Sequence, residues 1–130
     1  MPRFLNPRTV PPAASRYSQA VAIGTPFKRL VLSGQLGIAP DGKLAEGLEA
    51  QLSQAFDNVL ALVAAADLEL TDIVKVTVFV TLPGSVAVYR KVREAKFGKH
   101  APAATYLQVA GLASPEFLAE IEAEAVREAR

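Results

Sequence analysis

The sequence contains no cysteine and only one histidine, His100. The lack of cysteine excludes disulfides, thiolate nucleophiles and cysteine-based zinc sites. One histidine cannot supply a two-histidine metal motif, and the acids are not clustered as a carboxylate cage would require. We therefore expect no bound metal. His100 lies in a predicted loop, where a lone histidine is more often a bystander than an acid or base of catalysis.

An excess of charge of either sign is also missing. Lysine and arginine number 14 and aspartate and glutamate 13, which gives a formal net charge of +1. This balance does not favour a nucleic-acid or anionic-membrane partner, and we expect neither. The densest basic cluster is Arg90, Lys91, Arg93 and Lys96. A cluster of this size usually forms a solvated helix face, with nucleic-acid binding as the less favoured alternative.

Long apolar runs are absent as well. No stretch approaches about 18 consecutive apolar residues, the length that suggests a transmembrane helix. The first residues lack the apolar run of a signal peptide, so we expect a cytoplasmic protein. With 130 residues the chain can bury a sizeable core. We assign residues 1–130 to a single domain, with 1–16 as an extended N-terminal lead-in rich in proline, arginine and serine.

The predicted elements follow the order ββ-α-β-α-ββ, which is an α+β pattern. The predicted strands are 19–24, 28–36, 72–81, 103–110 and 118–126, and the predicted helices are 48–66 and 85–97. The last strand alternates apolar and acidic residues, although alanine and glutamate also suit a helix. Two helices can cover one face of a sheet and leave the other open, so we expect oligomerisation to cover the open face.

The strand at 72–81 has the strongest β pattern, because it is rich in β-branched residues. One face should lie under the first helix, and it consists of Val74, Val76, Val78 and Val80. The other face, formed by Lys75, Thr77 and Phe79, is mixed, as a subunit interface or a ligand cleft would require. In the helix at 48–66, the polar residues, Gln51 and Asn58 among them, fall largely outside the apolar face.

Two small polar segments interrupt the first strands. They are Tyr17–Val21, with the sequence Tyr-Ser-Gln-Ala-Val, and Leu32–Gln35, with the sequence Leu-Ser-Gly-Gln. A glycine beside polar residues at a strand end leaves backbone N–H groups available to a ligand. These segments are therefore candidates for a binding site.

These two segments resemble the signatures of the YjgF/RidA family of reactive-intermediate (enamine/imine) deaminases, which is also known as endoribonuclease L-PSP. The resemblance extends to 74–80, to Pro102-Ala103 and to Glu120–Glu122. It implies a chorismate-mutase-like fold, with two helices on one face of a mixed sheet. It also implies a homotrimer with clefts between subunits, a small-molecule substrate such as a 2-imino or enamine acid, and no cofactor.

The resemblance assigns roles to four residues. Tyr17 would stack on a planar imine and give one hydrogen bond, and Gly34 would offer its N–H to the ligand, with Ser33 beside it. Glu120 would place the hydrolytic water. Structural alternatives remain open, because Tyr17 could pack at a rim, Gly34 could serve backbone geometry, and Glu120 could be one exposed acid of an alternating strand.

The sequence departs from the family at the position of its carboxylate-binding arginine, where Ala104 stands. Alanine cannot form the bidentate, charge-assisted pair that a guanidinium makes with a carboxylate. Arg90, on the second predicted helix, could supply the missing cation, although a solvated or interface ion pair is the favoured alternative; Arg16 is a weaker candidate. We include Thr105, beside Ala104, among the substrate-binding candidates.

Three functions follow from the resemblance and from this departure. The leading one is hydrolysis of an imine or enamine with release of ammonia, on a substrate other than the standard short 2-imino acids. The alternative is a trimer that binds a metabolite without turnover. Endoribonuclease activity is the least favoured, because the chain has near-neutral charge and no basic strip interleaved with aromatic residues.

Overall fold

The computed structural model describes residues 3–14, 17–24 and 26–128. Its elements are β1 (Arg3–Leu5), β2 (Ala20–Ile23), β3 (Phe27–Leu32), β4 (Gln35–Leu36), α1 (Leu48–Ala65), a 3₁₀ turn (Leu70–Asp72), β5 (Ile73–Val80), α2 (Val86–Phe97), β6 (Ala103–Gln108) and β7 (Ala119–Glu128). Both predicted helices are present. Two predictions change in detail: the lead-in contains strand β1, and the strand expected at 28–36 is divided into β3 and β4.

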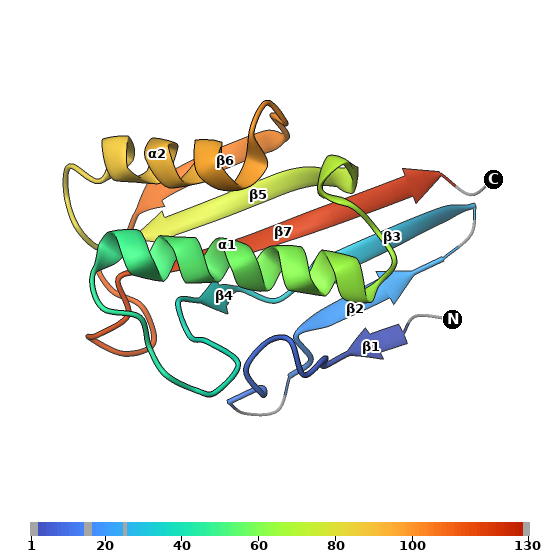
Figure 1. Cartoon of the computed structure of the whole chain (residues 1–130), viewed down its shortest axis with the longest axis horizontal. Helices are drawn as coiled ribbons and strands as arrows, with labels where there is room; N and C mark the ends of the chain where they lie inside the picture. The colour runs from blue at the N-terminus through green and yellow to red at the C-terminus, as the bar shows by residue number, and fades with distance from the viewer. Residues whose placement is uncertain (1–2, 15–16, 25, 129–130) are drawn as a thin grey trace.

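The strands form one mixed sheet in the order β1-β2-β3-β7-β5-β6, with β4 paired to the other end of β7. Among the strand pairs of the described residues, only β5 and β6 run parallel, and α2 is the crossover that connects them. Figure 1 shows α1 and α2 on the same face of the sheet. The predicted architecture, two helices packed on one face of a mixed sheet, is confirmed.

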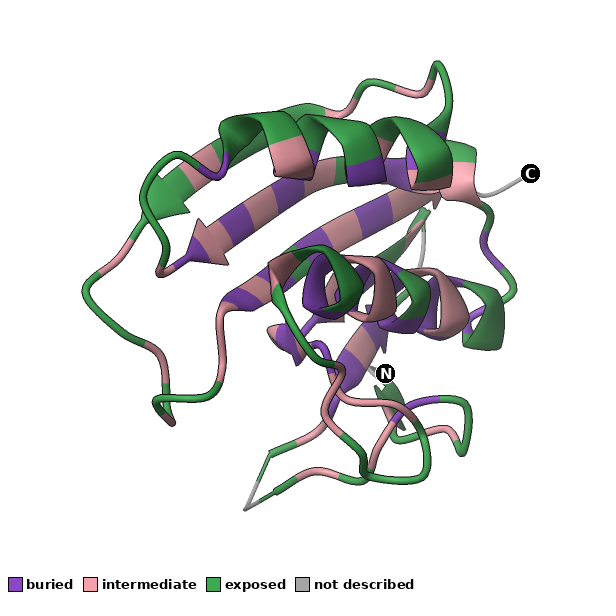
Figure 2. Ribbon diagram, turned by 60° about the vertical axis from the view of Figure 1, so that its left-hand side comes forward, coloured by how far each residue is buried: buried purple, intermediate pink, exposed green. Residues whose placement is uncertain are grey.

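The last strand, β7, lies between β3 and β5 in the sheet. Its period of two separates the side chains of the two faces. The residues facing the helices are buried: Ala119, Ile121, Ala123 and Ala125. Glu120 and Glu124 on the opposite face are half-buried, and Glu122 is exposed. Figure 2 shows this alternation as stripes along the strands. The strand interpretation is therefore confirmed over the competing helix.

The core lies between the helices and the sheet. On α1 the side chains of Leu52, Phe56 and Leu62 are completely buried. Phe56 packs edge to face on Phe97 of α2, with ring centroids 5.1 Å apart. This packing fixes both helices against the sheet. In the part of the chain that the structure describes, no helix is long and apolar enough to cross a bilayer.

Two sequence expectations about buried faces were wrong. Val74 is 43% exposed rather than buried, because a register shift between Ile73 and Lys75 lets Ile73 take the inward position. Gln51 and Asn58 were expected outside the apolar face of α1, but both are buried, at 2% and 1% exposure. These two amides contribute to the site described next.

Candidate active site

A pocket of about 630 Å³ lies where the β3–β4 connection, the N-terminal loop and the start of β7 meet. Its lining residues are Pro11, Pro12, Ala14, Tyr17, Gln19, Ser33, Gly34, Gln35, Leu36, Ile38, Gly42, Ala113, Phe117 and Glu120. Four of the six residues singled out from the sequence therefore line one cavity: Tyr17, Ser33, Gly34 and Glu120. They come from segments up to about a hundred residues apart in the sequence.

Glu120 and Gly34 are in close contact. The β4–β7 pairing places Leu36 opposite Glu120, and this brings the β3–β4 connection over the carboxylate. A Cβ atom on residue 34 would lie only 2.1 Å from Glu120 Oε2. Glycine therefore lets the carboxylate approach the backbone this closely, and any larger residue would displace the end of the Glu120 side chain.

The carboxyl group of Glu120 is in an environment that disfavours its charge. Partial burial raises the pKa of Glu120, and the negative charge of Glu122 raises it further. None of the described residues that line the pocket is a lysine or arginine. A carboxylate with a raised pKa is a stronger base than a solvated one, and beside open space it can accept a proton from water.

Tyr17 forms part of the pocket wall and is 45% exposed. Its hydroxyl group accepts a hydrogen bond of 3.3 Å from the backbone N–H of Ala14. This contact ties the phenol to the N-terminal loop and leaves much of the ring accessible. The ring can therefore stack on a planar ligand, and the hydroxyl hydrogen remains available as a donor.

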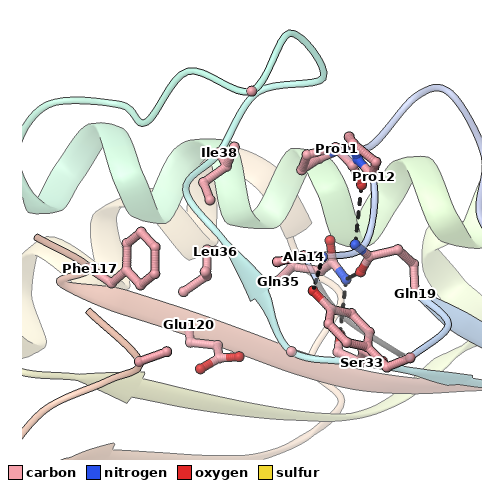
Figure 3. A pocket seen from close by; sticks show the side chains of 14 residues that line it. Pro11, Pro12, Ala14, Gln19, Ser33, Gln35, Leu36, Ile38, Phe117 and Glu120 are labelled. Atoms are coloured by element: carbon pink, nitrogen blue, oxygen red, sulfur yellow. Dashed lines mark hydrogen bonds between the residues drawn. The ribbon is translucent and has the colours of Figure 1, made fainter.

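Ser33, Gln19 and Gln35 form a polar network at one end of the pocket (Figure 3). Ser33 Oγ donates to the carbonyl of Ser18 at 2.5 Å, and Gln35 Nε2 donates to Gln19 Oε1 at 2.8 Å. Gln19 Nε2 in turn donates to the carbonyl of Pro11 at 3.2 Å. The network connects the N-terminal loop to the β3–β4 connection, and the Ser33 hydroxyl can still accept a hydrogen bond.

The opposite end of the pocket is held by two buried amides of α1, those of Gln51 and Asn58. Gln51 Nε2 donates to the carbonyl of Glu116 at 3.0 Å, and Gln51 Oε1 accepts from the N–H of Leu118 at 2.8 Å. Asn58 Nδ2 donates to the carbonyls of Leu36 and Ile38, at 3.2 and 2.8 Å. Buried amides with satisfied hydrogen bonds are costly to displace, so these wall segments are fixed.

The other candidates lie outside this pocket within one chain. Arg90 is exposed on α2, and Ala104 and Thr105 are exposed on β6, at the edge of the sheet. Thr105 Oγ1 accepts a hydrogen bond of 2.6 Å from Lys75 Nζ. Arg16 lies outside the described residues.

Two further residues considered in the sequence have contacts elsewhere. His100 Nε2 donates to the carbonyl of Ile73 at 2.8 Å and does not line the pocket. The guanidinium of Arg93 lies 5.4 Å from the ring centroid of Tyr89 on its own helix. His100 therefore has a structural contact, as the bystander interpretation expects.

Sequence reasoning did not assign roles to the amides that hold the pocket or to Phe117. A signal was present for two of them. Gln51 and Asn58 are seven residues apart, and Ala55 and Leu62 continue their row on the core side of α1. A buried amide in such a row needs a partner outside the helix, which predicts contact with the backbone of another segment.

The chain matches known proteins over nearly its whole length. The model of the family described as endoribonuclease L-PSP matches residues 8–127. A curated relative, the 2-iminobutanoate/2-iminopropanoate deaminase of Salmonella typhimurium, is 37% identical, with 98% of this chain and 99% of the relative covered.

Two solved structures have the same fold. The YjgF gene product of Escherichia coli has a TM-score of 0.89 at 36% identity, with 97% of this chain and 99% of that chain covered. The structure of Escherichia coli TdcF with bound serine has a TM-score of 0.89 at 32% identity, with the same coverage.

Proposed function

This chain belongs to the YjgF/RidA family, described as endoribonuclease L-PSP, and on that premise we propose that it hydrolyses an imine or enamine and releases ammonia. One observation carries the proposal. The carboxylate of Glu120, whose pKa is raised by burial, lies against Gly34 in a pocket that Tyr17 also lines. The functions named for the relatives, deamination of 2-iminobutanoate and 2-iminopropanoate, agree with this arrangement.

The chemistry needs a base and a site for the electrophile. The substrate reacts as the protonated imine. Glu120 takes a proton from water as the water oxygen bonds to the imine carbon and the C=N π electrons move to the nitrogen, which gives a neutral carbinolamine. Glu120 then returns this proton to the nitrogen, the C–N bond breaks, and ammonia leaves as the carbonyl forms and the hydroxyl proton passes to Glu120. The Gly34 N–H and the Tyr17 hydroxyl donate hydrogen bonds to the substrate. The imine is already an electrophile, so no cofactor takes part.

The complete site, in this proposal, lies between subunits of a homotrimer. The pocket lies at the β3–β4 connection and the start of β7, whereas Arg90 lies on α2 and Thr105 on β6, the strand at one edge of the sheet. A head-to-tail ring brings the α2/β6 edge of one copy to the pocket of the next. The support for this contact is the uncovered sheet face and the exposure of Leu107 on β6, at 42%.

Ala104 affects the choice of substrate. Since alanine has no cation for a carboxylate, and the pocket lining has none among the described residues, the standard short 2-imino acids would bind weakly. Arg90 of the neighbouring copy is the proposed replacement, and Thr105 of that copy would add one hydrogen bond.

The test uses imines generated in solution from amino acids by an amino-acid oxidase. The purified protein should accelerate their loss above the spontaneous rate, and Glu120→Gln should lower kcat about 100-fold or more. Glu122→Gln, which changes an exposed acid two residues away on the same strand, is the matched control and should keep most of the activity.

The alternative, a metabolite-binding trimer, predicts a different result. No imine in the panel would be turned over, yet a ligand would raise Tm. In either case, sedimentation should give a species three times the chain mass of 13.8 kDa. A single 13.8 kDa species at micromolar concentration would contradict the shared site.

A further inference from the structure

One end of the pocket is apolar. Leu36 ends β4, Ile38 follows it, and Phe117 lies in the turn before β7, and all three side chains are half-buried. Figure 3 shows them gathered on the same side of the pocket, next to Glu120, whereas Ser33, Gln35 and Gln19 occupy the other side. A ligand that reaches Glu120 therefore has an apolar surface on one side and hydrogen-bonding groups on the other.

The size of the pocket also matters. Within a single chain, its volume of about 630 Å³ lies within the range of pockets that bind drug-sized molecules. A short imine such as 2-iminobutanoate, which has only an ethyl substituent, would leave the apolar side chains facing water. Binding a larger apolar group there removes that surface from water, which favours the larger ligand.

The apolar end is held in place from α1. Gln51 hydrogen-bonds to Glu116 and Leu118, the residues on either side of Phe117. Asn58 hydrogen-bonds to the carbonyls of Leu36 and Ile38 themselves. Two buried amides of one helix thus fix the backbone at all three apolar side chains. A surface formed before the ligand arrives loses less entropy on binding.

We propose, on the basis of the imine hydrolysis proposed above, that Leu36, Ile38 and Phe117 form a subsite for the substrate's side chain. The structure points to an imine with a branched or aromatic substituent of four or more carbons. The imine carbon lies beside Glu120 and Gly34, and the substituent packs against the three apolar side chains. Gln51 and Asn58 are positioning residues for this specificity.

The experiment measures a ratio of specificities. The imines derived from phenylalanine and from alanine are generated in solution, and kcat/KM is determined for each. The wild-type protein should prefer the phenylalanine-derived imine by about 10-fold or more. Phe117→Ala should remove most of this preference, chiefly by raising KM for the larger imine. Leu82→Ala, which changes an exposed apolar residue outside the pocket, should leave the ratio unchanged.

A second variant tests the positioning role. Gln51→Met keeps a side chain of similar length but removes both hydrogen bonds to the turn that carries Phe117. The preference should fall by several-fold, while kcat for the alanine-derived imine is retained. A purely structural role for Gln51 would lower Tm without changing the ratio of the two substrates, and that result would contradict the positioning role.

The failure of this inference can be told apart from the failure of the proposed function. Equal hydrolysis of both imines, or a preference for the smaller one, overturns the subsite while the hydrolase function stands. If neither imine is hydrolysed, the hydrolase function fails, and the subsite is then tested by ligand binding. Phenylpyruvate should then raise Tm more than pyruvate does, and Phe117→Ala should abolish the difference. Equal shifts for the two ligands in the wild-type protein would overturn the subsite.

Discussion

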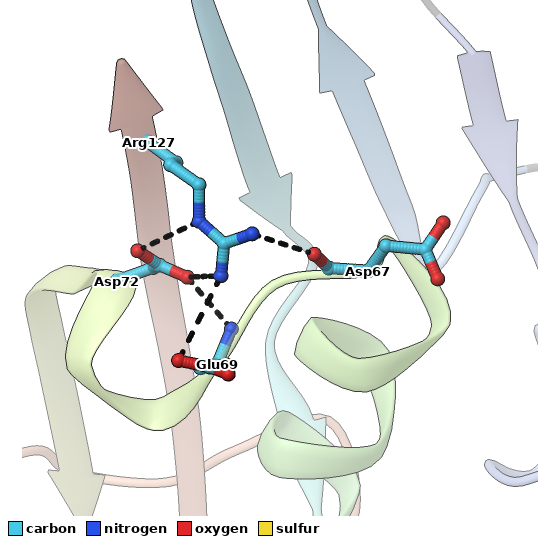
Figure 4. A network of polar contacts seen from close by, with 4 residues as sticks. All are labelled: Asp67, Glu69, Asp72 and Arg127. Atoms are coloured by element: carbon cyan, nitrogen blue, oxygen red, sulfur yellow. Dashed lines mark hydrogen bonds and ion pairs between the residues drawn. The ribbon is translucent and has the colours of Figure 1, made fainter. Parts of the chain in front are cut away.

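Two carboxyl groups near the two ends of β7 have opposite electrostatic surroundings. Near the C-terminal end of β7, Asp72 accepts hydrogen bonds from Arg127 Nη2 at 2.6 Å, from Arg127 Nε at 3.3 Å and from the N–H of Glu69 at 2.7 Å (Figure 4). Near its N-terminal end, Glu120 has a glycine and open space beside it, and no lysine or arginine among the described residues that line the pocket.

The pKa values follow these surroundings. Partial burial acts to raise the pKa of Asp72, but the hydrogen bonds from Arg127 and Glu69 and the positive charge of Arg127 outweigh it and hold the pKa below its usual value. Burial raises the pKa of Glu120, and Glu122 adds to the effect. A paired carboxylate contributes to stability, whereas an unpaired one is held at a cost in stability and is available for chemistry.

The largest effect, a loss of imine turnover, should come from moving the unpaired carboxylate of Glu120. In Gly34→Ala the new Cβ would lie 2.1 Å from Glu120 Oε2, so the flexible carboxylate must shift. A misplacement of about 1 Å can cost about 100-fold in rate, and we expect a loss of that size in kcat. Stability should change little, because the displaced atoms are the end of a side chain. The measurement is imine turnover alongside thermal unfolding.

Gly24→Ala provides the control for that substitution, since a Cβ there meets nothing within 4 Å. It should leave both turnover and Tm unchanged. Full activity in Gly34→Ala would mean that the position of the Glu120 carboxylate is not important for the reaction, and the comparison between the two carboxyl groups would then have no functional meaning.

The second effect concerns Asp72, the paired carboxylate. Its substitution should change stability and leave activity unchanged. Asp72→Asn should lower the free energy of unfolding at neutral pH by about 1–2 kcal/mol, because the charge-assisted bonds to a half-exposed arginine weaken. Imine turnover should stay the same. Asp41→Asn is the control, since the ion pair of Asp41 with Lys43 is long, at 3.9 Å, and exposed. Urea unfolding measures the difference.

Asp72→Asn and Glu120→Gln should change the pH dependence of stability in opposite directions. The folded-state pKa of Asp72 is lowered from 3.8, so its contribution is complete above about that pH and is lost as the pH falls through the lowered value. The gap between wild type and Asp72→Asn should therefore close in acid. The pKa of Glu120 is raised from 4.5, so its ionisation destabilises the folded state increasingly above that pH. Glu120→Gln should become more stable than wild type there.

The same contrast explains what the sequence could predict. Periodicity and turn signals identified the helices and most strands, because burial of an apolar face is a local pattern. The resemblance identified Glu120, Gly34 and Tyr17, which line one pocket. The environment of each carboxylate could not be predicted, because Glu120 and Asp72 are both acids next to apolar strand residues in the sequence. Their partners, or the lack of them, come from segments distant in the chain.

The wall of the pocket is a second example. Phe117 lies in the turn before β7, where its N–H donates to the carbonyl of Ser114 at 3.1 Å, and the sequence pattern assigned it no role. The position of its backbone depends on Gln51, which is 65 and 67 residues away from the two groups that it binds, Glu116 and Leu118. The register shift between Ile73 and Lys75 likewise places Val74 at the surface. Contacts of this kind depend on tertiary packing, and one sequence does not encode them as a periodic pattern.

The smallest effect should come from removing Arg90. This change tests whether the pocket beside Glu120 obtains a cation from another copy, as Asp72 obtains one from Arg127. Arg90→Ala should raise KM for a carboxylate-bearing imine by about 2- to 5-fold, with kcat retained, because an exposed charge pair contributes modestly. Salt should weaken wild-type binding and have less effect on the variant.

Lys91→Ala, whose lysine pairs with Glu49 at 2.7 Å, is the control and should leave KM unchanged. Sedimentation should show the same assembly for both variants. An unchanged KM in Arg90→Ala, with the assembly intact, would mean that the substrate carboxylate is bound without Arg90, and the apolar walls and backbone donors would then account for substrate affinity.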